Sequence, residues 1–246
     1  MIIERTEHPG WLSNAYLVAD GPGGHGVLID GQGVAEPLLD RIDRDRITIT
    51  HVLLTHEDHD HVVDAERHRK RFGTPIVASA VSAEALGGLV DETIADGDAV
   101  RSGGLEVRAI ATPGHCLGHL AFLVDGTECF TADCLFRGTV GGTRGRGEIF
   151  ALHKASIMER LMGLPAETRV HPGHSAPSTV GVEWESNPFV RAWRGLDPVH
   201  EESCRVSGEE ATLVLWGPDY DGTHKAWVRF PDGQEAIVGC SRVERL

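Results

Sequence analysis

The chain has 246 residues, of which 41% are hydrophobic and 24% charged, and its formal net charge is −14 at pH 7. This length and composition fit one well-buried α/β domain with a small addition. The negative charge argues against nucleic acid and against an anionic membrane surface as partners, because both favour lysine and arginine. No apolar stretch approaches the roughly 20 residues of a membrane span.

The N-terminus and the cysteines favour a cytoplasmic enzyme. The first five residues lack the pattern of a signal peptide. The five cysteines are odd in number and form no CxxC pair, so neither a disulfide framework nor a cysteine zinc site is indicated. The unusual count is the 14 histidines, and their positions matter more than their number.

Apolar periodicity predicts alternating strands and helices in the first half of the chain. The predicted strands are residues 14–19, 26–30, 47–54, 76–78 and two around a turn within 97–111. The predicted helices are residues 36–43, 61–72 and 80–89. Strand-rich blocks separated by single helices indicate an α/β fold in which helices cover sheets.

Side chains that can bind metal follow the ends of four predicted strands. The strand at 47–54 is followed by six ionisable residues, His56-Glu57-Asp58-His59-Asp60-His61. Three later strands end before Thr112-Pro113-Gly114-His115, Asp133 and His171-Pro172-Gly173-His174. Without a metal, six such groups in sequence would suffer desolvation and like-charge repulsion. Rigid strands fix where ligands point, so the sequence predicts a metal site.

The spacing divides the candidate ligands between two metals. Alternate residues of an extended loop point to one side, so positions 56 and 58 can share a metal. His56 and Asp58 would then bind a first metal and Asp60 and His61 a second. Two metals about 3.5–4 Å apart can activate water and polarise a carbonyl or phosphoryl oxygen, and Asp60 would also orient that water.

The ordered motifs resemble the metallo-β-lactamase fold superfamily, whose pattern runs HxHxDH, TPGH, a lone Asp and PGH. The resemblance covers about residues 10–195. It implies an αββα sandwich with a two-metal site at one edge of its two sheets. It also implies that His115 completes the first site, that His174 completes the second and that Asp133 bridges them. The predicted fold is therefore α/β, with a metallo-β-lactamase-like domain over residues 1–198 and a small β unit over residues 199–246.

One ligand position departs from that pattern, because Asp58 stands where the family has its second histidine. A flavodiiron-type member carries an acidic residue at this position and binds two irons. His56, His115 and a carboxylate also resemble the two-histidine-one-carboxylate set that suits iron(II). Two divalent ions are expected, with zinc as the leading candidate and iron or manganese as alternatives. A single bound metal, or His59 as a replacement ligand, stays open.

Residues 133–142 and 172–189 look like the corresponding segments of glyoxalase II and its persulfide dioxygenase relatives, which act on glutathione thioesters or glutathione persulfide. Glutathione-binding relatives place Lys or Arg nine positions after the bridging Asp, where this chain has Gly142. Arg144 or Arg146 would have to supply the charge that binds substrate, and Arg144 is the candidate substrate-binding residue.

Residues 112–119 also resemble the matching motif of acyl-homoserine lactone lactonases. Those enzymes use a tyrosine near the metals, and this chain has only Tyr16 and Tyr220. Nucleic-acid-processing members of the superfamily have a large extra domain and a basic surface, which this chain lacks.

The remaining histidines and two cysteines are expected to be structural. His119 would orient His115 or a loop carbonyl. The residues expected to serve hydrogen bonding, packing or surface roles are His51, His68, His153, His171, Cys116 and Cys134.

The C-terminal residues differ in character from the rest. Three short strands at 212–216, 226–230 and 235–238, separated by turns, predict a small antiparallel β unit. It is too small to be safely independent and would pack on the main domain or on a partner subunit, which leaves a homo-oligomer open. Its aromatic residues are expected to form its own core.

Together these observations predict a metal-dependent hydrolase that acts on an ester-like carbonyl, a thioester or a lactone, of a small-molecule substrate. An iron-dependent oxidoreductase of the persulfide dioxygenase or flavodiiron type is one alternative, motivated by Asp58. A non-catalytic binding protein with a degenerate site is the other.

Overall fold

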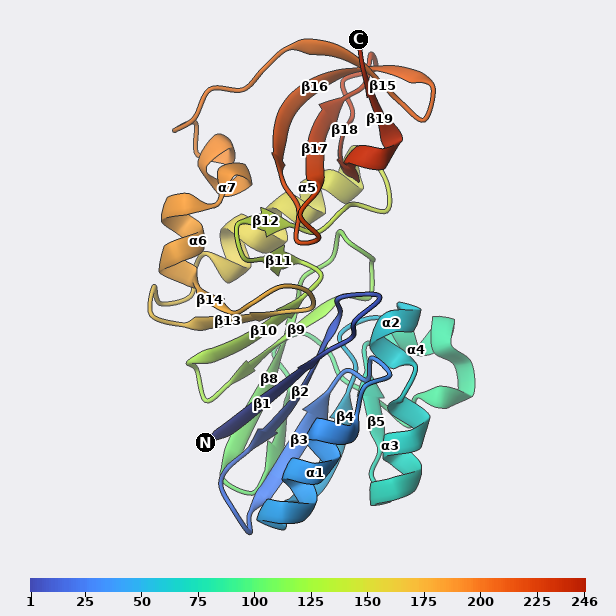
Figure 1. Cartoon of the computed structure of the whole chain (residues 1–246), viewed down its shortest axis with the longest axis vertical. Coiled ribbons are helices and arrows are strands. Elements are labelled where there is room, and N and C mark those ends of the chain that lie inside the picture. The colour runs from blue at the N-terminus through green and yellow to red at the C-terminus, as the bar shows by residue number, and fades with distance from the viewer.

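The computed structural model describes residues 1–246 and contains two six-stranded β-sheets packed face to face (Figure 1). Helices cover the outer faces of the sandwich, and a five-stranded sheet made by the C-terminal residues lies at one end of the molecule. The predicted αββα sandwich with a C-terminal β addition is confirmed. No helix is both long enough and apolar enough to cross a membrane.

The N-terminal half of the chain builds the first sheet. Its strands, in order across the sheet, are β1 (Ile2–Glu7), β2 (Asn14–Ala19), β3 (His25–Ile29), β4 (Thr48–Leu53), β5 (Ile76–Ala78) and β6 (Glu92–Thr93). Strands β1 to β3 are antiparallel, whereas β3 to β6 are parallel and therefore need crossover helices. These helices are α1 (Glu36–Asp45), α2 (His59–Val62), α3 (Ala65–Phe72) and α4 (Ala80–Leu86), the last followed by a 3-10 turn at Gly87–Leu89.

The second sheet has the order β14-β13-β10-β9-β8-β7. Its strands are β7 (Ala99–Ser102), β8 (Leu105–Ala111), β9 (Leu120–Val124), β10 (Glu128–Ala132), β13 (Arg169–Pro172) and β14 (Ser178–Thr179). The hairpin of β11 (Leu135–Phe136) and β12 (Thr139–Val140) follows β10. The helices of this half are α5 (Glu148–Ala155), a π-helical segment Ser156–Leu161, α6 (Val180–Ser186) and α7 (Pro188–Trp193).

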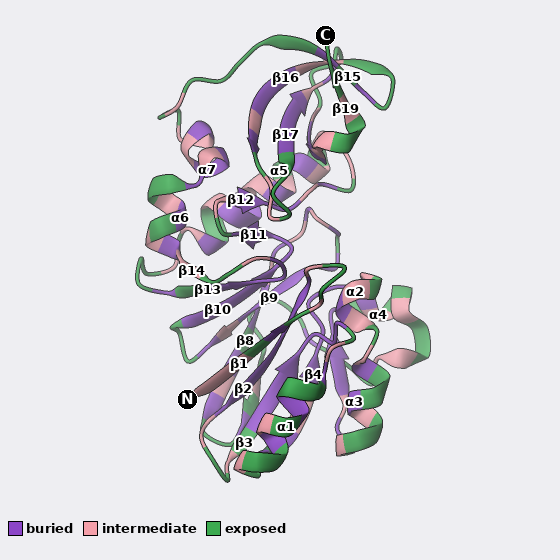
Figure 2. Ribbon diagram, viewed as in Figure 1, coloured by how far each residue is buried: buried purple, intermediate pink, exposed green.

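Alternate residues of the first sheet face different layers, as the two-residue period of a strand requires. Leu28 and Val52 belong to the core under the helices of the first sheet. Val27, Ile29 and Leu53 belong to the core between the two sheets. Figure 2 shows the result, with buried strands inside and helices whose outward faces are exposed.

The expected single helix over residues 61–72 is wrong, because the structure has α2 and α3 in its place. The carbonyl of His61 accepts a hydrogen bond from the Gly31 N–H (2.7 Å), and the Asp64 N–H donates to the Gly31 carbonyl (3.0 Å). These bonds take backbone groups away from a continuous helix. They also tie the candidate metal loop to the end of β3.

The C-terminal unit has five strands, in the order β18-β17-β16-β15-β19, where three were predicted. They are β15 (Glu202–Val206), β16 (Glu209–Pro218), β17 (His224–Arg229), β18 (Glu235–Gly239) and β19 (Val243–Arg245). The three predicted strands correspond to β16, β17 and β18. Strands β15 and β19 were missed because most of their residues are exposed and charged; only Cys204 and Val206 of β15 are buried.

The C-terminal unit shares a hydrophobic core with the sandwich. Trp227 and Ile237 belong to the same cluster of buried residues as Phe150 of α5 and Phe189 of α7. The expectation that the unit packs on the main domain is therefore confirmed for these elements. The domain boundary at residue 198 stays a prediction.

Candidate metal centre

The carboxyl ends of four strands bring the candidate ligands to one edge of the sandwich. Strand β4 leads into the loop of residues 56–61, β8 leads to His115, β10 to Asp133 and β13 to His174. Strands β10 and β13 are parallel neighbours, so the residues that follow them leave the second sheet at the same edge.

The first cluster of donor atoms consists of His56, Asp58 and His115. Asp58 Oδ2 lies 3.5 Å from His56 Nε2 and 3.1 Å from His115 Nε2. The His56 side chain is fully buried, whereas His115 and Asp58 keep 14% and 20% of their side-chain surface exposed. The structure thus places positions 56 and 58 on the same side of the loop.

The second cluster consists of Asp60, His61 and His174. Asp60 Oδ2 lies 3.6 Å from His61 Nε2 and 3.6 Å from His174 Nε2. Both imidazoles are buried. In each of these two clusters one donor atom per residue lies within 4.8 Å of the others.

Asp133 lies between the two clusters and faces both. Its Oδ2 is 4.0 Å from His56 Nε2, 3.8 Å from His115 Nε2 and 3.4 Å from His174 Nε2. Its Oδ1 is 3.4 Å from His61 Nε2. One carboxylate therefore reaches all four imidazoles, as a bridging ligand must.

Gly173 is required for this close approach. A Cβ at position 173 would lie 2.1 Å from Asp133 Oδ1 and 3.0 Å from His61 Cε1. The backbone before His174 can reach Asp133 only without a side chain at this position.

The donor atoms fit divalent metal ions. Nε2 of His56, Nε2 of His61 and Oδ1 of Asp133 are buried and make no hydrogen bond. Buried polar atoms without partners are costly and uncommon, so several of them aimed at one point indicate a bound ion. Imidazoles combined with carboxylates suit zinc, iron or manganese.

The charges of the cluster are mutually stabilised. Burial alone would raise the pKa of Asp133, but His174 and His61 outweigh it and hold that pKa well below its usual value. Burial likewise opposes ionisation of Asp58, yet the hydrogen bond with His115 and the nearby His56 imidazole lower its pKa. Both carboxylates are therefore ionised at neutral pH, the form in which a metal is bound.

Asp30 supports the ligand loop and was not among the predicted site residues. Its Oδ1 accepts a hydrogen bond from the Thr55 N–H (2.9 Å), and its Oδ2 lies 2.8 Å from Thr55 Oγ1 and 2.9 Å from His61 Nδ1. Thr55 Oγ1 is also 2.9 Å from His56 Nδ1. A carboxylate behind a metal-binding imidazole fixes its orientation and raises its basicity.

Asp30 ends the strand predicted at residues 26–30 and was given no role in the predicted site. Asp30 follows the buried strand β3, which is parallel to β4 with Ile29 opposite Leu53. The carboxyl ends of parallel neighbours meet at one edge, so an acidic residue after β3 must lie beside the loop after β4.

The expected role of His119 was wrong in detail. His115 Nδ1 lies 2.9 Å from the Gly142 carbonyl oxygen and needs no support from His119. His119 is buried, with Nδ1 2.8 Å from Thr112 Oγ1, and its Nε2 accepts a hydrogen bond from the Asp133 N–H at 3.2 Å. It holds the backbone of the central carboxylate.

The two candidate arginines lie in different places. An Arg144 guanidinium nitrogen pairs with Asp58 Oδ1, while another lies 3.7 Å from Glu57 Oε1. Arg146 pairs with Glu209 of the C-terminal unit at 2.5 Å. The structure therefore brings Arg144, and not Arg146, to the first cluster.

His59 belongs to neither cluster of donor atoms, and it is also absent from the group that His56, His61 and Asp133 form between them. Its ring meets the edge of Trp11 at a centroid distance of 5.4 Å, and its side chain is exposed. The structure therefore does not place it as a replacement for Asp58.

Other residues that were expected to be structural do not belong to the groups of donor atoms. His171 Nε2 lies 2.7 Å from Glu128 Oε2. His68 and His153 are buried in α3 and α5. The thiol of Cys116 donates a hydrogen bond to Glu57 Oε2 at 3.4 Å.

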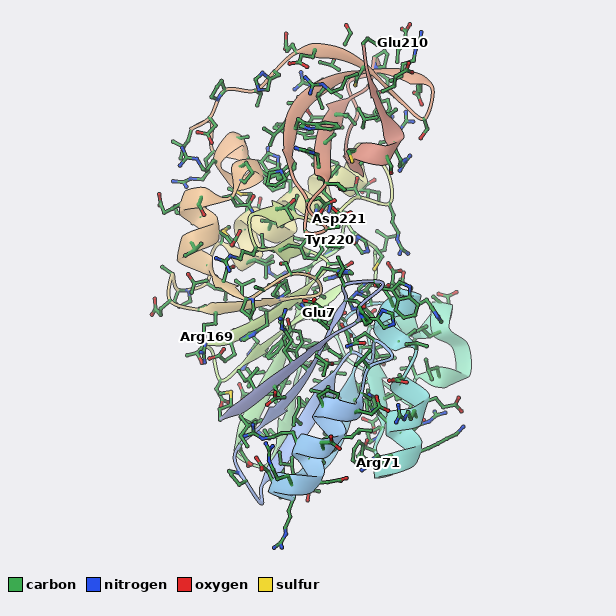
Figure 3. All side chains as sticks on the ribbon, viewed as in Figure 1. Glu7, Arg71, Arg169, Glu210, Tyr220 and Asp221 are labelled. Atoms are coloured by element: carbon green, nitrogen blue, oxygen red, sulfur yellow. The ribbon has the colours of Figure 1, made fainter.

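Tyr220, from the turn between β16 and β17, lies against the second cluster. Its ring stacks on His174 with centroids 4.2 Å apart and planes 18° apart, and it meets the edge of Phe136. Figure 3 shows Tyr220 where the C-terminal unit meets the sandwich. Its assignment to the core of the C-terminal unit was wrong, because the turn carries it out of that sheet. Burial, reinforced by Asp133, raises the pKa of its hydroxyl.

Lys225 anchors the turn that carries Tyr220. Its ammonium group is buried, donates to the Val140 carbonyl oxygen at 2.9 Å and lies 2.9 Å from Asp219 Oδ1. The C-terminal unit is thereby attached to the hairpin beside the metal cluster.

The family can now be stated. Residues 8–174 match the protein family described as the metallo-beta-lactamase superfamily, and the chain belongs to that superfamily. It is 36% identical over 217 residues to a hydroxyacylglutathione hydrolase of Rhodospirillum rubrum, covering 72% of this chain and 82% of the relative. It is 29% identical over 186 residues to a probable polyketide biosynthesis zinc-dependent hydrolase, BaeB, of Bacillus velezensis, covering 74% of this chain and 81% of the relative.

Solved structures share the fold. The structure of ETHE1 from Myxococcus xanthus superposes with a TM-score of 0.70 at 28% identity and covers 78% of this chain and 85% of that one. The structure of TTHA1623 in a di-iron-bound form has a TM-score of 0.61 at 31% identity, covering 76% of this chain and 99% of that one. Relatives thus include proteins named as hydrolases, one of them zinc-dependent, and one structure of this fold contains two irons.

Proposed function

We propose that this protein is a metal-dependent hydrolase that cleaves an ester-like carbonyl, a thioester or a lactone, in a small molecule. The observation that carries the proposal is that Asp133 faces two clusters, His56, Asp58 and His115 on one side and Asp60, His61 and His174 on the other. When bound, a metal pair would polarise the substrate carbonyl and lower the pKa of a water molecule to about 7.

The residues of the chain would supply position and proton control. The carboxylate of Asp60 is 26% exposed, so it can accept a hydrogen bond from the attacking water as well as face the second cluster. The backbone hydrogen bond from Asp133 to His119 and the contacts of Asp30 hold the ligand atoms before substrate arrives. Such preorganisation removes the cost of arranging the centre during the reaction.

Similarity to a hydroxyacylglutathione hydrolase and to a probable zinc-dependent hydrolase supports a thioester substrate and zinc as the first choices. The Tyr220 ring stacks on His174, so a tyrosine lies beside the second cluster, and this supports keeping a lactone among the candidate substrates. A cytoplasmic location and any homo-oligomeric state stay predictions.

A hydrolysis screen tests the proposal. The protein would be prepared metal-free, loaded separately with zinc, manganese or iron(II), and assayed on a hydroxyacylglutathione thioester, an aryl thioester, a lactone and a phosphoester. We expect turnover of a thioester or a lactone that Asp60→Asn reduces. Absence of turnover on all substrates with all three metals would contradict a hydrolase and favour a non-catalytic binding protein.

An iron-dependent oxidoreductase is the second candidate, and Asp58 is the observation that favours it. Two histidines and one carboxylate, with His56 Nε2 and His115 Nε2 both within 3.5 Å of Asp58 Oδ2, form a ligand set that suits iron(II). Elemental analysis after expression in iron-rich medium tests this reading. Stoichiometric zinc without iron would exclude it.

A further inference from the structure

The two carboxylate oxygens of Asp58 face different partners. Oδ2 points at the first cluster, 3.1 Å from His115 Nε2 and 3.5 Å from His56 Nε2. Oδ1 points away from those nitrogens and is paired with the Arg144 guanidinium. A carboxylate held in this way offers one oxygen to a metal and keeps the other occupied.

This pairing changes the charge of the first cluster. A histidine ligand is neutral, whereas the Asp58 carboxylate, paired with the Arg144 guanidinium, adds a negative charge to a centre that already contains Asp133 and Asp60. Arg144 supplies one positive charge that balances it. An Asp58–Arg144 pair is therefore neutral overall, as one histidine would be, and it keeps an oxygen where the imidazole nitrogen would stand.

The two residues before Arg144 are held by hydrogen bonds, one to the first cluster and the other to strand β18. The Gly142 carbonyl oxygen lies 2.9 Å from His115 Nδ1. The Thr143 N–H donates to the Ile237 carbonyl oxygen at 2.9 Å, and the Ile237 N–H donates to Thr143 Oγ1 at 3.1 Å. The residue after these anchors is Arg144, so its side chain starts from a position set by the first cluster and by strand β18.

We propose that Arg144 is a positioning residue for Asp58, and that the Asp58–Arg144 pair together replaces one histidine ligand of the centre. The proposal rests on the metal-dependent function proposed above. Arg144 acts on the metal through Asp58, so removing it weakens binding at the first cluster and leaves the second cluster intact. Its contact is with a ligand of the metal, in contrast to the substrate contact that the sequence predicted.

A double-mutant cycle in metal affinity tests the proposal without an activity assay. The four proteins are wild type, Arg144→Leu, Asp58→His and the double variant, each titrated with cobalt(II) against a chelator of known affinity. We expect Arg144→Leu to weaken one of two metal equivalents by about 10–100-fold, the range found for groups that orient a metal ligand. In the Asp58→His background Arg144→Leu should change metal affinity less than about threefold, because the carboxylate that Arg144 contacts is no longer present.

Arg146→Leu is the matched control, since Arg146 lies two residues away and pairs with Glu209. It should bind both metals as the wild type does. Arg144→Lys, which keeps the charge and loses the planar fork, should lie between the wild type and Arg144→Leu and reports on the pair if the leucine variant folds poorly.

Two results would overturn the inference. One is unchanged affinity for both metals in Arg144→Leu, and the other is an equal loss in the Asp58→His background. A fall in kcat/KM for Arg144→Leu with both metal affinities unchanged would show that Arg144 binds substrate, overturning the inference while leaving a hydrolase intact. Metal binding by the wild type without any hydrolysis would remove the proposed function and leave the cycle valid.

Discussion

The two clusters of the metal centre are built in different ways. The second cluster places His61 and His174 in buried positions, with Asp30 behind one imidazole and the Tyr220 ring stacked on the other. In the first cluster His56 is buried, and Asp58 is paired with the half-exposed Arg144. This difference indicates that aspartate can stand in place of a histidine ligand where a partly exposed arginine balances its charge.

The largest expected effect comes from the residue that both clusters share. Asp133→Ala removes the carboxylate that faces four imidazoles, so we expect both metal equivalents to be lost and kcat/KM to fall roughly 10³-fold or more, beyond the loss of a single oxyanion donor. Elemental analysis and hydrolysis rates measure it. Asp40→Ala on the exposed side of α1 is the control. Retention of both metals by Asp133→Ala would show that the clusters bind independently.

Asp30→Ala tests whether the carboxylate behind His61 strengthens metal binding at the second cluster. It removes the carboxylate behind His61 and leaves the Thr55 N–H without its acceptor. We expect about 10–100-fold weaker binding of the second metal, with a smaller effect on the first through Thr55 and His56. Chelator competition resolves the two equivalents. Equal weakening of both would mean that the clusters share their support more than the geometry indicates.

Tyr220 tests whether the C-terminal unit contributes to the centre. Tyr220→Leu removes the ring stacked on His174, and we expect the second metal to bind roughly tenfold more weakly. Tyr220→Phe keeps the ring and should bind metal within about twofold of the wild type. Trp216→Leu, in the same unit on strand β16, is the control for general loosening. If it matches Tyr220→Leu, the stacking has no specific role.

His68, a buried histidine outside the metal centre, tests how burial without carboxylate ligands around it changes a histidine pKa. Asp133 and Asp30 raise the pKa of His61 in spite of its burial, whereas burial lowers the pKa of His68 from 6.5 to about 4. Between these values the unfolded chain binds a proton on His68 that the folded protein does not, so the free energy of unfolding falls as the pH falls below 6.5.

Between pH 7 and pH 5 the free energy of unfolding of the metal-free wild type should fall by about 2 kcal/mol more than that of metal-free His68→Leu. Urea unfolding at the two pH values measures the difference. His200→Leu, at an exposed position, should leave the loss unchanged. An identical loss in wild type and His68→Leu would mean that His68 is hydrated or paired in solution.

Many of the strands could be predicted because they are short apolar stretches whose ends carry the candidate ligands, whereas the sandwich itself was implied by the family resemblance. The predicted ligands were singled out by their spacing and by the family motifs, and the structure brings them together at one edge: His56, Asp58, Asp60, His61, His115, Asp133 and His174. The contacts of Asp30 could not be seen without the parallel pairing of β3 and β4, which is a tertiary property.

The contributions of Tyr220 and Arg144 depend on longer-range packing. Tyr220 is separated from His174 by two helices and a strand-rich segment, and its turn reaches the centre through long-range contacts such as that of Lys225 with Val140. Arg144 lies in a glycine-rich loop whose path is set by hydrogen bonds to β18. Local periodicity carries no information on either contact.

The central claim is that seven side chains bind two metal ions with Asp133 between them. Anomalous diffraction at the absorption edge of the bound metal tests it directly. We expect two anomalous peaks about 3.5–4 Å apart, both in contact with Asp133. One peak should lie beside His56, Asp58 and His115, and the other beside Asp60, His61 and His174. A protein that binds no metal, or a peak away from these residues, would contradict it.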